Sequence, residues 1–278
     1  MGHDDSVPDR KTAGSPPRLP CMTSESSPPR PPVPQGTLTL ARGLDILHAV
    51  AEGAHDLKGV VDATGIGRST AHRLIQLLEL RGFVRTVHGT SYTLGPQLID
   101  YGFRALHQQP LPVLARPVLE RLAATVQDTV HLAVEDAGQV LYLDKIPGSR
   151  GAEMRSRIGH RMPLTRTGIG KSLLLDEPHR WAEQYTAEHP GAHSPQELAA
   201  FRRTMEDGAG RDSTMDLEEN EPGIRCVAAP VRDARGAVVA AISVSATQPY
   251  MPAERMQALV PVVRQAAQAI GRELGRSA

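Results

Sequence analysis

The sequence of 278 residues is poor in cysteine and carries no net formal charge. Its cysteines, Cys21 and Cys226, lie far apart without disulfide or metal-ligand spacing, so we expect both thiols to be reduced. The 11 histidines are scattered and show neither the two-histidine helical spacing nor the Cys-His spacing of a metal site. We therefore expect no metal and no cofactor. With 31 basic and 31 acidic residues, the net charge favours no class of partner.

Long apolar runs are also absent. No run approaches the length of about 20 residues that spans a bilayer, and the amino-terminal stretch MGHDDSVPDRK has no apolar signal region. These absences predict a soluble, cytoplasmic protein. The length is sufficient for two modest domains that each bury a core.

Residues 1–36 contain nine prolines, several serines and almost no large apolar side chains. This composition cannot bury enough surface to offset the conformational entropy of ordering, so we predict a disordered tail. The run PPRPPVP, from Pro28 to Pro34, leaves a polyproline docking motif as an alternative. Met22 is a candidate for the native start.

The stretch from Gly65 to Arg81, GIGRSTAHRLIQLLELR, indicates the turn and the second helix of a helix-turn-helix. Its apolar residues recur at i, i+3, i+4 and i+7, which predicts one buried stripe formed by Ala71, Leu74, Ile75 and Leu78. A shorter stripe predicts the preceding helix, with Leu57, Val60, Val61 and Thr64.

The opposite face of the predicted second helix is polar. Its side chains are short enough to reach base edges or phosphates from the first half of a helix laid in the major groove. The predicted DNA-binding residues are Arg68, Ser69, Thr70, His72, Arg73 and Gln76. An inward-facing or capping Thr70, and an ordinary helical hairpin with a solvated polar face, remain the alternatives.

A wing is expected after this helix. Two β-rich runs, Phe83–Val87 and Tyr92–Leu94, are separated by a turn at His88–Ser91, which predicts the wing. Between Gly67 and His88 four arginines accompany a single acid, Glu79, whereas Thr37 to Gly95 carries six basic and five acidic residues. Because the positive charge is confined to the second helix and the wing, where phosphates would lie, the pattern favours DNA binding.

A first helix from Leu38 to Gly53 completes this unit. Its inward stripe is predicted from Leu40, Leu44, Leu47 and Ala51, widened by Ile46 and Val50. Pro96 occupies a first-turn position and opens a helix that runs to about Leu106. We therefore predict a winged helix-turn-helix domain at 37–95 and a linker helix within 96–110.

Residues 111–278 indicate a mixed α/β domain. Helices are predicted at Val113–Val126, Gly168–Leu175, Pro178–Glu188, Pro195–Asp207 and Pro252–Leu274. Strands are predicted at Val130–Val134, Gln139–Ile146, Cys226–Val231 and Val238–Ser245. The first two strands and the last two are each joined by a short turn, which predicts antiparallel pairs. Helices of uneven length fit a sheet with helices on its faces rather than a regular parallel doubly wound fold.

Several blocks of the sequence, in this order, resemble the IclR family of bacterial transcriptional regulators, and the resemblance covers the chain from Thr37 to its end. The blocks are TLARGLDILHAVA, TGIGRSTAHRLIQLLELRGFV, YTLG, TVHLAVED, RMPLTRTGIGKSLL, EENEPGIRCVAAPVRD and AAISVSAT. The resemblance implies a multi-domain α/β protein with an amino-terminal winged helix-turn-helix and a GAF-like effector-binding domain at 111–278. It also implies dimers or dimers of dimers on palindromic operator DNA, controlled by a small keto, sugar or aromatic acid.

The resemblance further implies a set of effector contacts. They are Met154, Met162, Gly168, Ile169, Asp216, Ile224, Cys226, Ser243 and Ser245. The chain departs from the family pattern at Thr165–Arg166 and at Asp212–Thr214, at the rim of the implied pocket.

The chemistry of these residue types is compatible with an acid ligand. Gly168 to Gly170 precede a predicted helix, whose free N–H groups and dipole attract a carboxylate. Asp216 can accept hydrogen bonds from hydroxyls, and Ser243 and Ser245 share one strand face because of the period of two. Met154, Met162 and Ile224 would supply apolar walls. Simple packing remains the alternative for each residue.

Two enzyme readings compete with this hypothesis. RTGIGKS resembles the end of a phosphate-binding loop, but Thr165 stands where that loop requires glycine, and Lys171 is then an exposed helix residue or a salt-bridge partner. Cys226 with His131 or His160 could form a nucleophile and its base. However, Cys226 begins an apolar strand, where a small buried hydrophobic role is common. We therefore expect a protein that is not an enzyme.

Overall fold

The computed structural model describes residues 34, 36–89, 91–108, 110–150, 154–189 and 194–277, and these form two compact units, Met1–Leu98 and Ile99–Ala278. Almost all of the predicted tail at 1–36, with Cys21, Met22 and most of PPRPPVP, lies outside the described residues. Among the described residues, no helix combines the length and the apolar character needed to cross a membrane.

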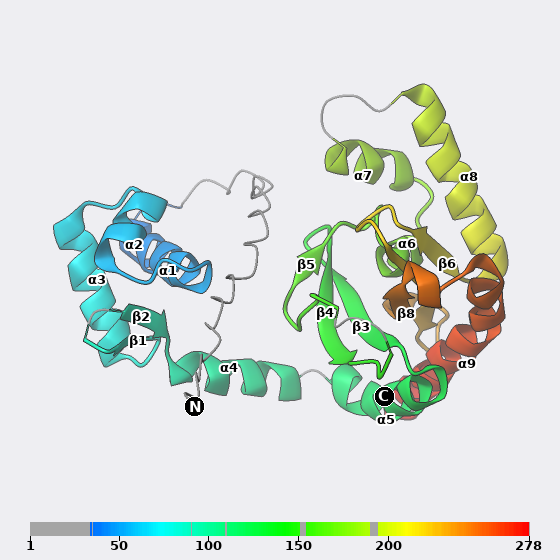
Figure 1. Ribbon diagram of the computed structural model, residues 1–278, viewed down its shortest axis with the longest axis horizontal. Helices are drawn as coiled ribbons and strands as arrows, with labels where there is room; N and C mark the ends of the chain where they lie inside the picture. The colour runs from blue at the N-terminus through cyan, green and yellow to red at the C-terminus, as the bar shows by residue number, and fades with distance from the viewer. Residues whose placement is uncertain are drawn as a thin grey trace, which may run out of the picture. The chain divides into compact units, whose positions relative to one another are not determined.

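The first unit is a winged helix-turn-helix, as predicted (Figure 1). Its elements are α1 (Leu38–Ala51), α2 (Leu57–Thr64), α3 (Arg68–Leu80), β1 (Val84–Val87) and β2 (Ser91–Leu94). Its buried core consists of Ile46, Val50, Val60, Ile66, Ala71, Ile75 and Val84. The stripe predicted on α3 is confirmed, because Ala71 and Ile75 are buried and Leu74 and Leu78 pack partly buried against them.

The turn between α2 and α3 follows from its local sequence. The Asp56 carboxylate caps α2 by accepting the N–H of Gly59 at 2.6 Å. The helix ends at Gly65, whose φ of 68° lies in the left-handed region that favours glycine. Ile66 follows and is buried in the core, so the turn is held against the bundle.

The predicted inward stripe of α1 is wrong in part. Leu40 and Leu44 are 67% and 56% exposed, whereas the buried residues of the helix are Ile46, Ala49 and Val50. A helix with apolar residues on two sides can turn only one of them to a single core. The stripe at 46, 49 and 50 has the i, i+3, i+4 spacing of a buried face, and it is the one that the core accepts.

The wing is an antiparallel pair in which Val84 lies opposite Leu94. Its base is tight, because the Gly95 N–H donates to the Phe83 carbonyl at 2.7 Å. A Cβ atom at Gly95 would lie 2.1 Å from the carbonyl oxygen of Gly82. Glycine is therefore required where β2 leaves the wing.

Helix α4 (Pro96–His107) follows the wing, and the boundary between the two compact units falls inside it, after Leu98. The second unit contains one six-stranded antiparallel sheet with the strand order β5-β4-β3-β8-β7-β6. The strands are β3 (Thr129–Asp136), β4 (Gln139–Ile146), β5 (Arg161–Met162), β6 (Thr214–Leu217), β7 (Ile224–Arg232) and β8 (Val238–Thr247). Both predicted hairpins, β3 with β4 and β7 with β8, are confirmed as antiparallel pairs.

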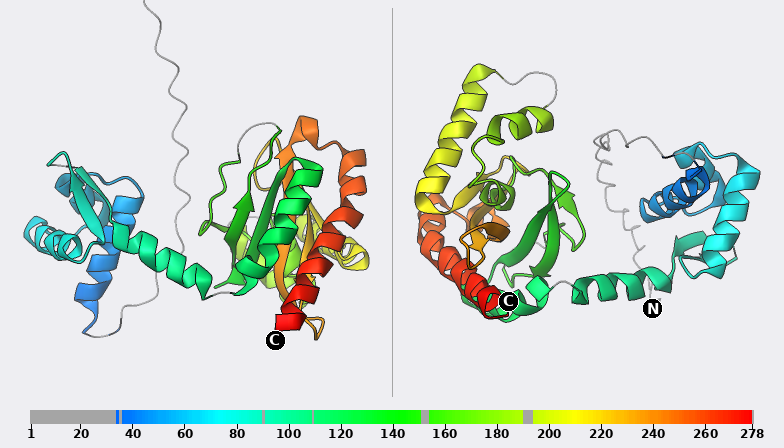
Figure 2. Two further views of the ribbon diagram at one scale, coloured as in Figure 1. Left: turned by 90° about the horizontal axis from the view of Figure 1, so that it is seen from below. Right: turned by 180° about the vertical axis from the view of Figure 1, so that it is seen from behind.

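Helices cover both faces of this sheet, as predicted (Figures 1 and 2). They are α5 (Pro110–Val126), α6 (Gly168–Leu173), α7 (Trp181–Glu188), α8 (Pro195–Arg211) and α9 (Ala253–Ser277), with a short 3₁₀ turn, η1, at Gln248–Tyr250. Helices α5 and α9 lie side by side and pack on the apolar face that includes Val227, Ala229 and Val231. Helices α6, α7 and α8 pack on the other face, against Ala228 and Ala241.

The differences from the sequence prediction lie at the ends of helices and in two short strands. Helix α8 ends at Arg211 instead of Asp207, and α5 begins at Pro110 instead of Val113. Helix α6 ends at Leu173 instead of Leu175, and α7 begins at Trp181 instead of Pro178. Strands β5 and β6 were not predicted. Strand β5 has two residues and β6 has four, which is too short for a period of two to stand out from the surrounding loop sequence.

Candidate functional site

The candidate DNA-reading surface lies at the start of α3. The side chains of Arg68, Ser69, His72, Arg73 and Gln76 are exposed, as the prediction requires. Thr70 is half-buried and therefore lies between the polar face and the core. The first turn of α3 carries no side-chain cap, because its N-cap residue is Gly67. A polar face with uncapped N–H groups at its start is suited to phosphate oxygens.

The acid within this region is withdrawn from the polar face. The carboxylate of Glu79, in the last turn of α3, accepts a hydrogen bond from the Thr86 hydroxyl on β1. On the same wing, the Arg85 Nε donates to the Thr93 hydroxyl at 3.2 Å, which orients its guanidinium along the strand pair. The contact between Glu79 and Thr86 therefore joins the wing to α3 and leaves the arginines to dominate the surface charge.

The second unit contains a cavity on the sheet face that carries α6. The cavity itself has a volume of about 100 Å³. Together with the open space around its mouth, the empty volume is about 620 Å³. Eight of the nine predicted effector contacts line it, namely Met154, Met162, Ile169, Asp216, Ile224, Cys226, Ser243 and Ser245. The ninth, Gly168, lies against the cavity wall, since a Cβ atom there would lie 2.5 Å from the Cys226 Sγ. The structure thus brings the predicted set together; that they bind an effector stays a prediction.

The sheet register explains this gathering. Ser245 lies directly opposite Cys226, and Cys226 lies directly opposite Asp216, so three neighbouring strands place them in one row. In the next row on the same face, Ser243 lies opposite His131. Residues that are directly opposite point to the same face of a sheet, so the rows form a polar floor.

Asp216 is the buried acid of this floor. Its carboxylate accepts the N–H of Glu219 at 2.8 Å, and it is only 4% exposed. Burial raises the pKa of Asp216 to about 6, although backbone hydrogen bonds from Glu219 and the charge of Lys171 act in the opposite direction. The carboxyl group therefore changes its charge state close to neutral pH.

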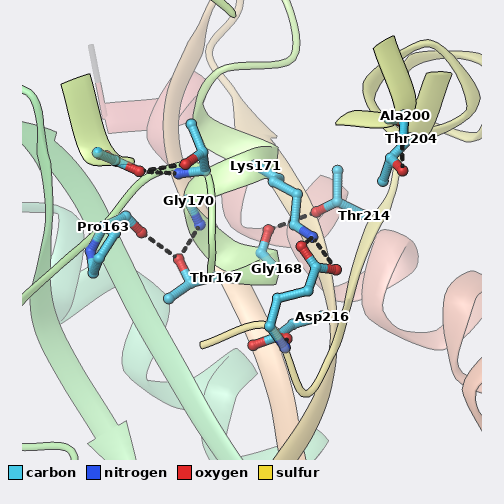
Figure 3. Close-up of polar contacts among 12 residues, drawn as sticks. Pro163, Thr167, Gly168, Gly170, Lys171, Ala200, Thr204, Thr214 and Asp216 are labelled. Carbon is cyan, nitrogen blue, oxygen red and sulfur yellow. Dashed lines mark hydrogen bonds and ion pairs between the residues drawn. The ribbon is translucent and has the colours of Figure 1, made fainter. Parts of the chain in front are cut away.

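Lys171 in α6 is fully buried, so the expectation of an exposed residue is wrong and that of a salt bridge is confirmed (Figure 3). Its Nζ donates to both carboxylate oxygens of Glu219 at 2.6 and 2.7 Å. A buried ammonium ion is tolerated only with such a partner, because its desolvation costs on the order of several kcal/mol. The pair fixes the loop between β6 and β7 above the cavity.

Helix α6 begins at Gly168, where its start was predicted, so the glycines do not precede the helix as the argument for an anion site assumed. Gly168 and Gly170 lie inside α6, and its N-cap is Thr167 (Figure 3). The Thr167 hydroxyl accepts the Gly170 N–H at 3.0 Å and donates to the Pro163 carbonyl at 2.9 Å. A Cβ atom at Gly170 would lie 2.4 Å from the Leu164 carbonyl oxygen, so this glycine serves close packing.

The nucleotide-binding alternative conflicts with the structure of RTGIGKS, most of which lies in α6. A phosphate-binding loop needs free backbone N–H groups, but here the Gly170 N–H donates to the Thr167 hydroxyl and the Lys171 N–H donates to the Thr167 carbonyl. Just before this segment, the carboxylate of Glu188 accepts the N–H of Leu164 at 2.7 Å and the N–H of Thr165 at 2.8 Å, and its charge would repel a phosphate. Lys171 is engaged with Glu219 as well.

The cysteine-nucleophile alternative conflicts with the electrostatics of the cavity. Burial raises the pKa of Cys226 to about 12, so the thiol stays protonated near neutral pH. Burial and the charge of Lys145 lower the pKa of His131 to about 3, so this imidazole is a weak base. His160 lines the same cavity but is exposed. The arrangement lacks an activated thiolate.

The predicted effector contacts are only part of the cavity lining. The additional residues are His131, Tyr142, Arg155, Ser156, His160, Thr167, Asn220 and Glu221. Among these, His131 and His160 had been considered only as bases for Cys226. The signal for His131 was a polar residue between Val130 and Leu132 in a predicted strand. Within the described ranges, no cluster of three or more histidine, cysteine, aspartate or glutamate side chains could hold a metal ion.

Comparisons with known proteins agree with this geometry. Residues 39–88 match the family profile described as IclR helix-turn-helix domain, and residues 103–272 match that described as Bacterial transcriptional regulator IclR C-terminal. The chain is similar to the HTH-type transcriptional regulator XynR of Escherichia coli (strain K12). The two are 32% identical over 248 residues, which cover 85% of this chain and 97% of that protein.

Solved structures show the same likeness. The IclR protein of Thermotoga maritima is 29% identical with a TM-score of 0.70, over 86% of this chain and 99% of that one. An IclR homologue from Microbacterium hydrocarbonoxydans, complexed with 4-hydroxybenzoate, is 24% identical with a TM-score of 0.73. That match covers 86% of this chain and 100% of the other, and it shows a shared fold.

A pH-dependent stability is expected from Asp216. Because its pKa is raised from 3.8 to about 6, the folded protein must ionise a buried carboxyl group as the pH rises. The contribution of the protonated Asp216 to the free energy of unfolding is therefore fully present below about pH 4 and is lost as the pH rises through about 6. This contribution is at most about 3 kcal/mol. Chemical denaturation of the wild type and of Asp216→Asn across this range measures it, and parallel pH curves would contradict it.

Proposed function

The chain belongs to the IclR family of bacterial transcriptional regulators, and from this premise we propose that α3 reads operator DNA under the control of a small organic acid bound in the cavity of the second unit. The observation that carries the proposal is the exposed polar face at the start of α3, beside a wing whose Thr86 engages the acid of α3, Glu79. Ser69, Thr70 and Arg73 position or read bases, with Arg68, His72 and Gln76 as neighbours.

The proposed DNA-bound form contains at least two copies of the chain. A single winged helix-turn-helix offers a small interface, so specific regulation requires two reading helices on half-sites about 34 Å apart or a multiple of this. The exposed leucines of α1 support self-association through the first unit, since Leu38, Leu40 and Leu44 are each more than half exposed. Leu40 and Leu44 are one helical turn apart, and exposed apolar side chains that lie together mark interaction surfaces. A dimer or a dimer of dimers would cover them.

The proposed effector is a small keto, sugar or aromatic acid. The cavity combines apolar walls from Met154, Met162 and Ile224 with convergent polar groups on its floor, the pattern of a small-molecule site. Ser243 and Ser245 can donate hydroxyl hydrogens to keto or carboxylate oxygens, and Asp216 can accept a hydrogen bond from a ligand hydroxyl. The protein would bind this acid without converting it, because Cys226 and His131 are not activated.

Control of DNA binding requires that the effector favours one of two conformational states. Helix α4 belongs to both compact units, so it is the covalent path for this coupling. A regulator of this kind acts on chromosomal DNA, so we place it in the bacterial cytoplasm.

Arg73 provides the test of DNA reading. On a fragment selected by genome-wide footprinting of the purified protein, Arg73→Ala should weaken binding by about tenfold or more, since a bidentate base contact contributes about 1 to 3 kcal/mol. Loss on the selected fragment alone would identify a base contact. Equal loss on random DNA, with a smaller salt dependence, would identify a phosphate contact. Arg203→Ala, an exposed arginine of α8, is the control; unchanged binding by Arg73→Ala would contradict the role.

Self-association is tested by Leu44→Glu. A carboxylate placed in an apolar interface, and repeated by symmetry in the partner copy, should weaken association by about 100-fold or more. Sedimentation should therefore detect a smaller species than for the wild type at the same concentration. Leu217→Glu, at an exposed leucine of β6, is the matched control. A wild-type protein that sediments as a monomer would refute the proposal.

The effector class is tested by calorimetry with a panel of hydroxylated, keto and aromatic acids that includes 4-hydroxybenzoate. At least one acid should bind, and Ser243→Ala should weaken its binding by about tenfold through the loss of one hydrogen bond. A panel without any binding, for a protein that still selects genomic fragments, would leave the DNA function standing and remove the proposed effector class.

A further inference from the structure

One wall of the effector cavity lies outside the sheet and has no helix or strand of its own. Met154, Arg155 and Ser156 line the cavity from this segment, and of these only Met154 was among the predicted effector contacts. A segment without backbone ladder bonds keeps a single position only if side chains hold it. Two side chains of the sheet, Lys145 and His131, do so.

Lys145 in β4 holds the backbone of the wall. Its Nζ donates to the carbonyl oxygen of Met154 at 2.6 Å and to that of Ser156 at 2.8 Å. Hydrogen bonds with a charged donor are stronger than neutral ones. The two bonds span the residue between them, Arg155, so they fix both the position and the direction of this stretch.

His131 in β3 holds the side chain of the wall. It lies directly opposite Lys145 in the sheet, and its Nε2 is 2.7 Å from the Ser156 hydroxyl. Its other ring nitrogen, Nδ1, lies 3.4 Å from the Ser243 hydroxyl on β8. His131 therefore joins a proposed effector contact on the floor to the wall on the opposite side of the cavity.

The charge state of His131 is suited to this role. Burial, together with the charge of Lys145, lowers its pKa to about 3, so the ring is neutral at physiological pH. A neutral imidazole has one donor and one acceptor nitrogen, so it can bond to both serines whichever tautomer is present. A charged imidazole would repel the ammonium group of Lys145 beside it.

We propose that Lys145, together with His131, positions the Met154–Ser156 wall, sets the width of the cavity and thereby determines which acids fit. The choice among acids rests on the proposed function, whereas the position of the wall does not. Neither residue touches the ligand through this role; both act through the wall, as positioning residues.

The position of the wall can be measured without any ligand. Cys226 lines the same cavity and is buried, so its alkylation by iodoacetamide reports how often the cavity opens. In the full-length protein, Lys145→Met keeps the aliphatic stem and removes both bonds. It should raise the alkylation rate of Cys226, resolved by peptide mass spectrometry, by about tenfold, because the two charge-assisted hydrogen bonds that hold the wall are lost.

Three matched variants separate positioning from general destabilisation. Lys145→Arg retains the donors and should restore the wild-type rate, whereas Lys58→Met removes an exposed lysine of α2 and should leave the rate unchanged. Ser156→Ala removes only the bond to His131 and should raise the alkylation rate of Cys226 without lowering the unfolding midpoint. If Lys145→Met does not fold, Ser156→Ala alone tests the proposal. Wild-type rates in both Lys145→Met and Ser156→Ala, or no rescue by Lys145→Arg, would overturn the proposal.

Selectivity is measured by calorimetry with two hydroxylated acids of different size, lactate and gluconate. The wild type should discriminate between them, and Lys145→Met should reduce the ratio of their affinities by about tenfold, a readout that loss of stability alone would not change. An unchanged ratio would refute the role in selectivity. If no acid of the panel described above binds the wild type while Cys226 still becomes accessible in Lys145→Met, the proposed effector class fails and the positioning role stands.

Discussion

The alternation of side chains along antiparallel strands is the constraint on which the second unit depends. In β7, Val227, Ala229 and Val231 point to the face covered by α5 and α9, so Cys226 and Ala228 must point to the other face. The same rule in β8 turns Ser243 and Ser245 toward the cavity. A shift of the strand register by one residue would turn the serines into the apolar core and would turn valines into the cavity floor. The apolar core and the polar site therefore specify each other.

Buried charge is the second feature that organises the site. Glu219 connects the two charged groups of the site. Its side chain pairs with Lys171, and its backbone N–H donates to the carboxyl group of Asp216. Lys171 is fully buried whereas the side chain of Glu219 is 42% exposed, so removing Glu219 would leave a buried ammonium ion without a partner, which is costly. The polar groups of the cavity are thus held in fixed positions by hydrogen bonds and an ion pair, which favours selective binding of a small polar ligand.

Local patterns in the sequence were sufficient for much of the fold. The i, i+3, i+4 stripe of α3, the turn at Gly65 and the two hairpins of the second unit depend on residues close together in the chain, and each was predicted. The family resemblance supplied the residues that line the cavity, with Gly168 placed against its wall rather than on it.

The failures share one cause, which is dependence on contacts distant in sequence. For Lys171 the sequence left an exposed position or a salt bridge open, and neither its burial nor the identity of its partner could be predicted, because Glu219 lies 48 residues further along the chain. The orientation of α1 depended on which of two apolar stripes the bundle accepts, a choice that no single helix encodes. Strand β6 forms only because β7 pairs with it.

The carboxylate of Glu188 joins two parts of the second unit. From the end of α7 it accepts the N–H groups of Leu164 and Thr165, which lie between β5 and α6. Met162 ends β5, Thr167 caps α6, and both residues line the cavity, so the carboxylate anchors the backbone between them. A displacement of α7 is therefore transmitted to the cavity through a single side chain, a mechanical link from the periphery of the unit to its interior.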